Sequence, residues 1–353
     1  MMKTGDNSLF FELLPISVGA VNTLTGIYDD DRWLEAFETA KQQSVCGALS
    51  AFLDVLPSEQ LPSKAVCRKW MMARNVIERK NALADKRAGD LTVFFSGLGF
   101  DSCVLKGQGV ARLYPDPSLR ECGDIDIWVE GGRVRVLAAL IGRVPLSCPV
   151  YHHVDARFFE DIPVEVHFTP AWSYNPFMNR RIQRYFDFRK HAPGMHVPGG
   201  CAFSAPGAVF QAVFSLLHIS KHIINEGVGV RQLMDYYHIL RSMTSAERDE
   251  AAALLPGLGL SKVAGAVMYI AGELFGLDCS LMICEPDPWR GRKLLGDVML
   301  SGNFGHFDER GGGLGGRFVR FVCQYPSEVL WSPVWKVWHR LWRLRKGYLR
   351  KRK

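Results

Sequence analysis

Residues Val104–Val129 read VLKGQGVARLYPDPSLRECGDIDIWV and carry the strongest structural signal in this chain. The stretch ends with Asp124 and Asp126, one residue apart in an apolar run. A strand sends alternate side chains to opposite faces, so both carboxylates lie on one face and Ile125 and Ile127 on the other. Adjacent like charges repel, and the arrangement loses stability unless a cation lies between them. Magnesium is the natural candidate because it prefers a few carboxylate oxygens and shares its remaining positions with water and phosphate.

Two flanking segments make this pair more specific. Upstream, Lys106–Gly109 is a short turn that follows apolar residues, and its glycines let backbone N–H groups approach an anion closely. Downstream, Val164–Phe168 alternates again and offers a third carboxylate, Glu165. A turn, two carboxylates on one strand and a third on a later strand are the parts of a metal-dependent nucleotidyl-transfer site.

In these segments the chain resembles the nucleotidyltransferases of the DNA polymerase β superfamily. The closer resemblance is to a bacterial family of uncharacterised nucleotidyltransferases, whose central block reads like LKG…YP.P..R..GDIDI followed by a strand of the EVH type. It covers roughly residues 104–168. The superfamily's usual turn has serine or glycine after its first glycine, whereas Gln108 follows Gly107 here. The matching residues are Leu105, Lys106, Gly107, Tyr114, Pro115, Pro117, Arg120, Gly123, Asp124, Asp126, Glu165 and His167.

The resemblance implies that Asp124, Asp126 and Glu165 are the catalytic residues and the metal ligands. Two Mg²⁺ ions could clamp the α-phosphate of a nucleoside triphosphate, one lowering the pKa of the attacking group and the other neutralising the leaving pyrophosphate. Glu165 could also accept the proton of the nucleophile. The alternative is an ordinary strand with two aspartates that face solvent.

Four residues are the candidates for nucleotide binding. Lys106, Gly107 and Gln108 would form the phosphate cradle, with Lys106 as a mobile positive charge. The alternative for Lys106 is a surface lysine beside a tight turn. Arg120 could contact phosphate with both arms of its guanidinium, or it could pair with Asp124 or Asp126 and orient that carboxylate.

A histidine near the third carboxylate is a candidate substrate contact. His167 lies two residues beyond Glu165 and therefore on the same face of the strand. It could orient a carboxylate or contact the substrate. It could equally be a hydrogen-bonded histidine at a seam between domains.

Four further candidates for substrate contact lie in the later helical part. His218 and His222 share one face of the helix expected at Ala205–Asn225, because they are four residues apart. Zinc binding is disfavoured, since the pattern lacks the glutamate and the third ligand of a metalloprotease motif. The resemblance suggests that this helix lines the other wall of the cleft together with Arg231 and Asp235. The alternative is that Arg231 and Asp235 simply pair with each other.

Composition limits the class of protein. The 353 residues are 48% apolar and 22% charged, which is ordinary for a globular protein with two or three domains. The nine cysteines are scattered singly, which favours reduced thiols and a cytoplasmic location. The N-terminus lacks the sustained apolar core of a secretory signal, and no apolar run approaches the length of a membrane span.

The pattern predicts an α+β fold with a small mixed sheet as the nucleotidyltransferase core. We divide the chain into an N-terminal helical region at 1–90, the α/β core at 91–200, a helical domain at 201–310 and C-terminal helices with a basic tail at 311–353. Gly311–Gly316 is the expected flexible break before the last helices.

Within these parts, the residues at 171–200 are expected to be a connection punctuated by proline and glycine. Pro149–Phe159 and Val164–Phe168 are expected to pair as an antiparallel hairpin. Helices are expected at Lys64–Arg87, Asp90–Gly99, Ala205–Asn225, Gly229–Met243 and Leu260–Leu274.

The C-terminal segment combines tryptophans with basic residues. Trp331, Trp335, Trp338 and Trp342 follow a spacing of 4, 3 and 4 and so form one helical stripe. Lys336–Lys353 contains nine Lys/Arg and no Asp/Glu, so the rest of the chain sums to about −2 and carries no firm nucleic-acid signal. The stripe could dock on the body of the protein, lie on an anionic membrane surface, or help the tail hold RNA or another polyanion.

These patterns together predict a metal-dependent nucleotidyltransferase. It would move a nucleoside monophosphate from an NTP, with ATP as the expected donor, to an acceptor hydroxyl that the sequence does not identify. The acceptor could be a small molecule, a sugar, a protein side chain or an RNA end. The alternative is a non-catalytic nucleotidyltransferase-like binding module, tethered to RNA or to a membrane by its basic tail.

Overall fold

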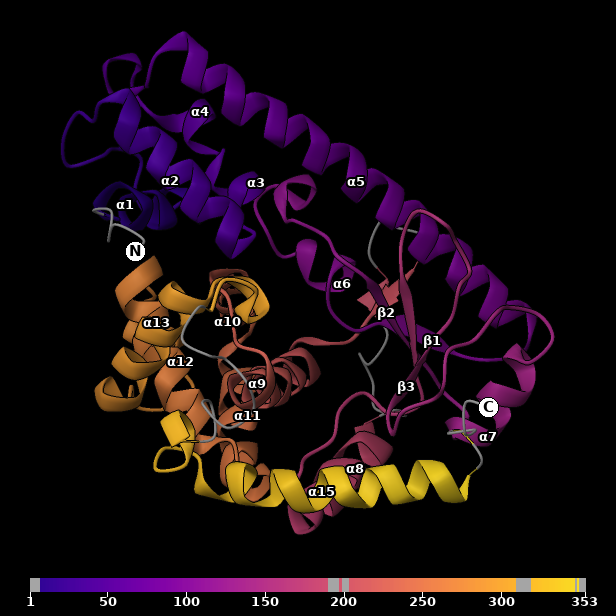
Figure 1. Cartoon of the computed structure of the whole chain (residues 1–353). Helices are drawn as coiled ribbons and strands as arrows, with labels where there is room; N and C mark the ends of the chain where they lie inside the picture. Colours follow the sequence, from indigo (N-terminus) through magenta and orange to yellow (C-terminus); the bar gives the residue numbers. More distant parts are fainter. Residues whose placement is uncertain (1–6, 190–196, 199–202, 309–318, 347, 349–353) are drawn as a thin grey trace.

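The computed structural model describes residues 7–189, 197–198, 203–308, 319–346 and 348 (Figure 1). Helices surround one small mixed sheet, so the predicted α+β fold is confirmed. The glycine run at Gly311–Gly316 and the last residues of the basic tail lie outside the described residues. The domain boundaries that we predicted stay predictions.

The main sheet has four strands in the order β1-β2-β4-β3. The central strands β2 and β4 are parallel, and both outer pairs are antiparallel, which confirms the expected β3–β4 hairpin. Asp126 of β2 lies directly beside Glu165 of β4 in this register. The bounds are Ser102–Val104 for β1, Ile125–Val129 for β2, His153–Asp155 for β3 and Val164–His167 for β4. A separate pair joins β5 (Val197–Pro198) to β6 (Ser204–Ala205).

The two faces of the main sheet differ in chemistry. Ile125, Ile127 and Val129 face a buried cluster that also contains Leu91 and Phe95 of α5 (Lys64–Gly97) and residues of α7 (Gly132–Leu140). The opposite face carries Asp126, Trp128, Glu165 and His167, and Trp128 stacks on Phe210 of α9 (Ala208–Asn225) at 5.8 Å. The alternation of side chains in β2 therefore sends the polar residues toward α9.

Helix α5 connects the N-terminal helices to the sheet. The helical segments expected at Lys64–Arg87 and Asp90–Gly99 form one helix of 34 residues, and Gly99 follows it with a φ of +74°. Its first half packs Trp70 against Phe37 and Phe52, while its second half packs on β1 and β2. The N-terminal helices are α1 (Ser8–Ser17), α2 (Asp30–Gln43), α3 (Cys46–Leu49) and α4 (Phe52–Val55), followed by the 3-10 turn η1 (Ser58–Gln60).

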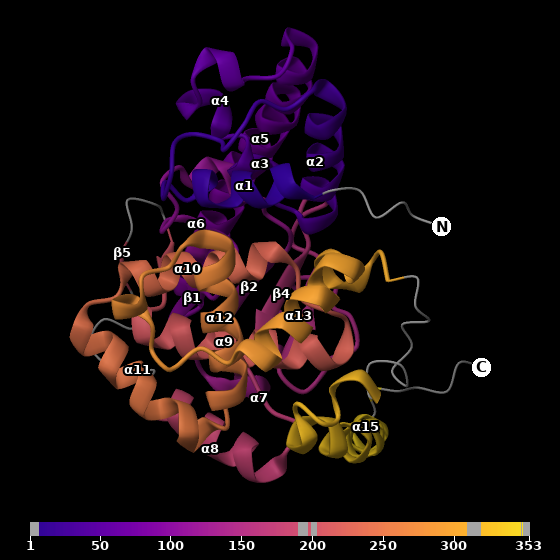
Figure 2. The ribbon, with the colours of Figure 1, turned by 90° about the vertical axis from the view of Figure 1, so that its left-hand side faces the viewer.

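Apart from β5 and β6, the described elements after β4 are helices and helical turns. Figures 1 and 2 show most of these helices together below the N-terminal group. The helices expected at 205–225, 229–243 and 260–274 correspond to α9, α10 and α12. Short turns are α6 (Gln108–Ala111), η2 (Pro117–Leu119), η3 (Cys279–Leu281) and η4 (Asn303–Gly305). The remaining helices are α8 (Pro176–Arg189), α10 (Val230–Ser242), α11 (Ser245–Leu258), α12 (Ser261–Phe275), α13 (Pro288–Ser301) and α15 (Pro326–Arg345).

Helix α8 corrects one expectation, because we predicted a connection punctuated by proline and glycine at residues 171–200 and the structure has a helix of 14 residues there. Pro176 is the first residue of α8, where its missing N–H costs nothing. Asn175 caps the start, since its side-chain oxygen accepts the N–H of Phe177 at 2.9 Å. One of the prolines in this segment therefore begins a helix, which buries Ile182 and Phe186.

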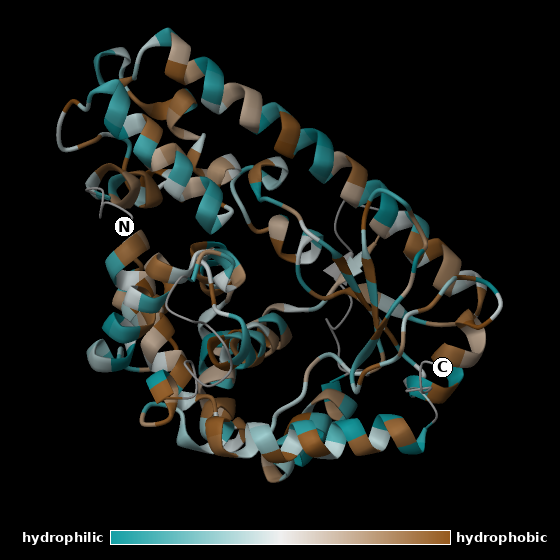
Figure 3. Ribbon diagram, in the orientation of Figure 1, coloured by the Kyte–Doolittle hydropathy of each residue, from teal (hydrophilic) through white to brown (hydrophobic). Residues whose placement is uncertain are grey.

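Helix α15 lies along the edge of the molecule, with apolar and polar residues alternating along it (Figure 3). Trp335 stacks on Trp172 at 3.8 Å and 15°, and the Glu328 carboxylate accepts the hydroxyl of Ser173 at 2.7 Å. The expectation that the tryptophan stripe docks on the body is therefore confirmed for Trp335. Among the described residues, none of the helices combines the length and the apolar character that crossing a bilayer requires.

We expect Trp335→Ala to lower the free energy of unfolding by about 2–3 kcal/mol, because it removes a stacked indole from a half-buried site. Trp338→Ala is the matched control. That indole is 45% exposed, so the expected loss is about 1 kcal/mol or less. Urea denaturation of both variants measures the difference, and equal losses would show that the stack contributes no more than a surface contact.

Candidate active site

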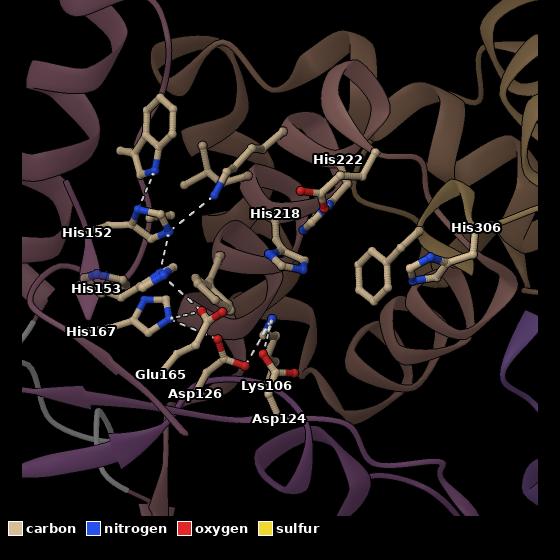
Figure 4. A pocket seen from close by; sticks show the side chains of 18 residues that line it. Lys106, Asp124, Asp126, His152, His153, Glu165, His167, His218, His222 and His306 are labelled. Carbon is tan, nitrogen blue, oxygen red and sulfur yellow. Dashed lines mark hydrogen bonds and ion pairs between the residues drawn. The ribbon is translucent and has the colours of Figure 1, made fainter. Parts of the chain in front are cut away.

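A pocket of about 360 Å³ lies between the polar face of the sheet and helix α9 (Figure 4). Its lining contains acidic, basic and imidazole side chains together with the aromatic ring of Trp172. The titratable residues that line it are Lys106, Asp124, Asp126, His152, His153, Glu165, His167, His218, Lys221, His222, Glu226 and His306.

Three carboxylates converge at the floor of this pocket. Asp126 is buried in β2, Asp124 immediately precedes that strand, and Glu165 lies beside Asp126 on β4. One oxygen from each residue lies within 4.8 Å of the others, which is close enough for all three to share a cation. The convergence that the strand alternation predicted is therefore present in the structure.

Lys106 partly neutralises the carboxylates. Its Nζ lies 3.0 Å from Oδ2 of Asp126 and 3.9 Å from Oδ2 of Asp124. Burial lowers the pKa of Lys106, but the nearby carboxylates of Asp126, Asp124 and Glu165 outweigh burial and hold that pKa above its ordinary value. Oδ2 of Asp126 is buried, and Lys106 is its ion-pair partner.

His167 holds two of the carboxylates in place. Its Nε2 lies 3.0 Å from Oδ1 of Asp126 and 3.3 Å from Oε2 of Glu165. Burial alone would lower the pKa of His167, yet the hydrogen bonds to these two carboxylates raise it to about 9. Burial works in the opposite direction on Glu165, but the hydrogen bond from His167 lowers the pKa of that carboxyl to about 2. The position of His167 fits the orienting role that we considered for it.

Two further histidines, His153 and His152, lie beyond Glu165, and we had not predicted a role for them from the sequence. Nδ1 of His153 lies 3.2 Å from Oε2 of Glu165 and 3.0 Å from Nε2 of His152. The indole N–H of Trp172 donates to Nδ1 of His152 at 2.9 Å. His153, Glu165 and His167 form another group whose ligand atoms lie within 4.8 Å of one another. The available signal was His153 in the hairpin, which pairs with His167 in the antiparallel register.

The predicted phosphate cradle is only partly open to the pocket. Gly107 has a φ of +56°, which favours glycine, and it ends the turn at which α6 begins. Lys106 and Gly107 line a smaller cavity beside Asp124. The side chain of Gln108 points the other way, since its Nε2 donates to Oδ1 of Asp85 at 2.8 Å. The Gln108 side chain is therefore part of the core under α5 and does not face the pocket.

Arg120 and Asp235 form a buried ion pair that replaces both pairings we had considered. Nε and Nη2 of Arg120 donate to the two carboxylate oxygens of Asp235 at 2.8 and 2.7 Å, and the hydroxyl of Tyr114 donates to Oδ1 at 2.7 Å. Asp235 therefore does not pair with Arg231, and Arg120 does not pair with Asp124 or Asp126. Arg231 donates instead to the backbone oxygen of Glu121 at 3.0 Å and lines the smaller cavity.

His218 and His222 both line the pocket from one face of α9, as their spacing predicted. Their rings are 4.1 Å apart, and Nδ1 of His222 lies 2.9 Å from Oε2 of Glu226. Among the described residues, the groups that could hold a metal do not include either histidine. Burial lowers the pKa of both imidazoles, so they present neutral rings to the pocket at neutral pH.

Carboxylates on neighbouring parallel strands beside a glycine turn are the arrangement that we expected of a nucleotidyltransferase. Residues 29–276 match the family model described as uncharacterised nucleotidyltransferase. Because the match covers well over half of the chain, the protein belongs to this family. No curated protein and no solved structure matched the chain.

The ion pair of Arg120 and Asp235 gives a test of the scaffold. We expect Arg120→Met and Asp235→Asn each to cost about 3–5 kcal/mol, since each leaves a buried charge without its partner. The double variant should cost clearly less than the sum of the two losses. Arg157→Met, which breaks an exposed pair with Glu160, should change stability by about 0.5 kcal/mol or less. Additive losses in urea denaturation would show that the two groups do not act as a pair.

The raised pKa of His167 predicts a loss of stability at alkaline pH in metal-free protein. The folded-state pKa is about 9 and the ordinary value is 6.5, so protonation favours the folded state. This contribution is complete below pH 6.5 and is lost as the pH rises through 9. Between pH 6 and 9.5 with a chelator present, the wild type should lose about 2–3 kcal/mol relative to His167→Gln. A pH-independent difference between the two proteins would contradict the assignment.

Proposed function

We propose that this protein transfers a nucleoside monophosphate from an NTP, with ATP as the expected donor, to an acceptor hydroxyl. The observation that carries the proposal is the convergence of Asp124, Asp126 and Glu165 on one pocket, next to Lys106 and the Gly107 turn. The family to which the chain belongs supports the reaction class.

The donor set fits Mg²⁺. All three groups offer carboxylate oxygens, and one oxygen of each lies within 4.8 Å of the others. Asp124, Asp126 and Glu165 would hold one or two ions, which when bound supply positive charge that stabilises the phosphates. That the ion is Mg²⁺ is part of what we propose.

The protein's own groups divide the remaining work. Lys106 and Arg231 line the smaller cavity beside Asp124 and would neutralise phosphate oxygens there. Glu165 is ionised at neutral pH, because the hydrogen bond from His167 lowers its pKa. We assign it to accept the proton of the acceptor hydroxyl. His167 holds both Asp126 and Glu165, and Arg120 would act only through the loop that leads to Asp124.

We expect Asp126→Asn to reduce Mg²⁺-dependent pyrophosphate release from ATP by a factor of about 100 or more, because it removes one ligand charge from the centre of the site. The measurement uses the full-length protein with ATP, Mg²⁺ and fractionated small molecules as acceptors. Asp101→Asn is the matched control, since Asp101 lies just before β1 and its backbone oxygen accepts the N–H of Glu130, at the end of β2 away from Asp124.

The same experiment distinguishes nucleotidyl transfer from the alternative function. A non-catalytic binding module would bind ATP without releasing pyrophosphate, and Asp126→Asn would then leave the assay unchanged. The buried Gln108 side chain is the one feature that favours this alternative, because the turn offers no side-chain hydroxyl to the phosphates.

A further inference from the structure

Lys221 places a positive charge on the wall of the pocket without a carboxylate partner. It lies on α9, and none of the ion pairs between described residues includes it. Burial lowers the pKa of Lys221 to about 8, and the like charge of Lys106 adds to that effect, while Glu165 and Glu226 oppose it from a distance. An ammonium group in such a position is costly unless a ligand supplies negative charge.

The nearest polar atom cannot satisfy this ammonium. Nζ of Lys221 lies 3.3 Å from Nε2 of His152. The indole of Trp172 is only a donor, so its bond to Nδ1 of His152 places the imidazole proton on Nε2. That N–H cannot accept a hydrogen bond from Lys221. The ring of Trp172 lies 5.2 Å from Nζ and holds the charge by a cation–π contact, and Lys221 lines the pocket.

The position of Lys221 relative to the carboxylates indicates which substrate it contacts. Lys106 lies against Asp126 and Asp124, beside the smaller cavity in which it and Arg231 would neutralise phosphate oxygens. We therefore assign this end to the leaving pyrophosphate. His153 lies against Glu165, and His152 connects His153 to Lys221 at the opposite end. In an in-line displacement, the nucleophile approaches from the side opposite to the leaving group. Lys221 therefore lies on the acceptor side.

We propose that the acceptor is an anionic molecule whose phosphate or carboxylate group binds Lys221 while its hydroxyl lies at Glu165. This inference rests on the proposed function and names its substrate class. In the reaction, the bond between the acceptor oxygen and the α-phosphorus forms, the bond to pyrophosphate breaks, and the hydroxyl proton passes to Glu165. His218, on the same face of α9, lines the same wall.

The test measures binding of inorganic phosphate to full-length protein saturated with Mg²⁺ and a non-hydrolysable ATP analogue. Saturation fills the triphosphate site, so calorimetry reports the remaining anion site, and acetate replaces phosphate as the carboxylate probe. We expect Lys221→Met to weaken phosphate binding at least about 10-fold and Lys221→Arg to retain most of it. Lys41→Met, at an exposed lysine, is the control, and all three variants should bind the analogue like the wild type.

Two results would overturn the proposal. Equal phosphate binding in the wild type and in Lys221→Met would show that Lys221 does not form an anion site. Analogue binding that falls in Lys221→Met would assign the lysine to the nucleotide. If the wild type does not bind the analogue at all, the proposed function fails, while phosphate binding that depends on Lys221 in nucleotide-free protein would still support the anion site.

An independent observation concerns the outer face of α15. Its large apolar side chains recur at a spacing of 4, 3, 4 and 3, which makes one continuous stripe along the helix. The exposed fractions are 58% for Leu330, 55% for Val334, 62% for Val337, 60% for Leu341 and 49% for Leu344. A stripe of this size that faces solvent marks an interaction surface.

The basic residues near this stripe indicate what kind of partner binds it. Arg340, Arg345 and Lys346 are exposed on the same helix, and Lys336–Lys353 carries nine basic residues without an acidic one. A second copy of the chain would bring the same positive charge against it, which disfavours self-association. From this we infer that the outer face of α15 lies on an anionic bilayer surface, with the apolar stripe in the interface and the basic residues at the head groups.

Sedimentation with vesicles tests this surface. The full chain should bind vesicles of phosphatidylcholine with 30% phosphatidylglycerol, and the double change Val337→Glu with Leu341→Glu should reduce the bound fraction at least about 10-fold. Val134→Glu, at a valine on α7 that is 82% exposed, should not. Unchanged vesicle binding in the double variant would overturn the inference, as would a dimer that the double variant dissociates.

Discussion

The buried negative charge of Asp126 is the constraint that organises the pocket. A carboxylate in the middle of a sheet is costly unless opposite charge surrounds it. Here Lys106 reaches one oxygen from the preceding turn and His167 reaches the other from the neighbouring strand. Asp124 and Glu165 add further negative charge nearby, so the two cations do not balance the site. The remaining imbalance is what makes the pocket suited to a bound cation.

The buried ion pair of Arg120 and Asp235 supports the pocket from the side of the helices. Arg120 lies shortly before Asp124, and its partner Asp235 lies on α10. The pair fixes the loop that leads into β2 against a helix that lies far away in the sequence. Tyr114 donates to the same carboxylate, so the residues of the central block converge on α10 as well as on the pocket. The loop that the Arg120–Asp235 pair holds therefore also leads to Asp124, one of the three carboxylates.

The parts of the site that could be predicted from the sequence are those set by local geometry. Strand alternation places Asp126 and Glu165 on one face, and a positive φ requires a glycine at Gly107. The partner of Arg120 could not be predicted, because 115 residues separate it from Asp235. His152 and His153 were missed for a related reason, since their roles depend on contacts with Trp172 and Glu165 across the fold.

The family match covers both the carboxylates and Lys221, but it ends before helix α15. The carboxylates, Lys106 and His167 lie within residues 29–276, whereas α15 begins after that range. Yet Trp335 of α15 stacks on Trp172, and Trp172 fixes the proton of His152, which faces Lys221. The C-terminal helix thus supports the side of the pocket that we assign to the acceptor. If the proposed chemistry resides in the matched region, a change in the C-terminal helix can alter acceptor binding while leaving the carboxylates in place.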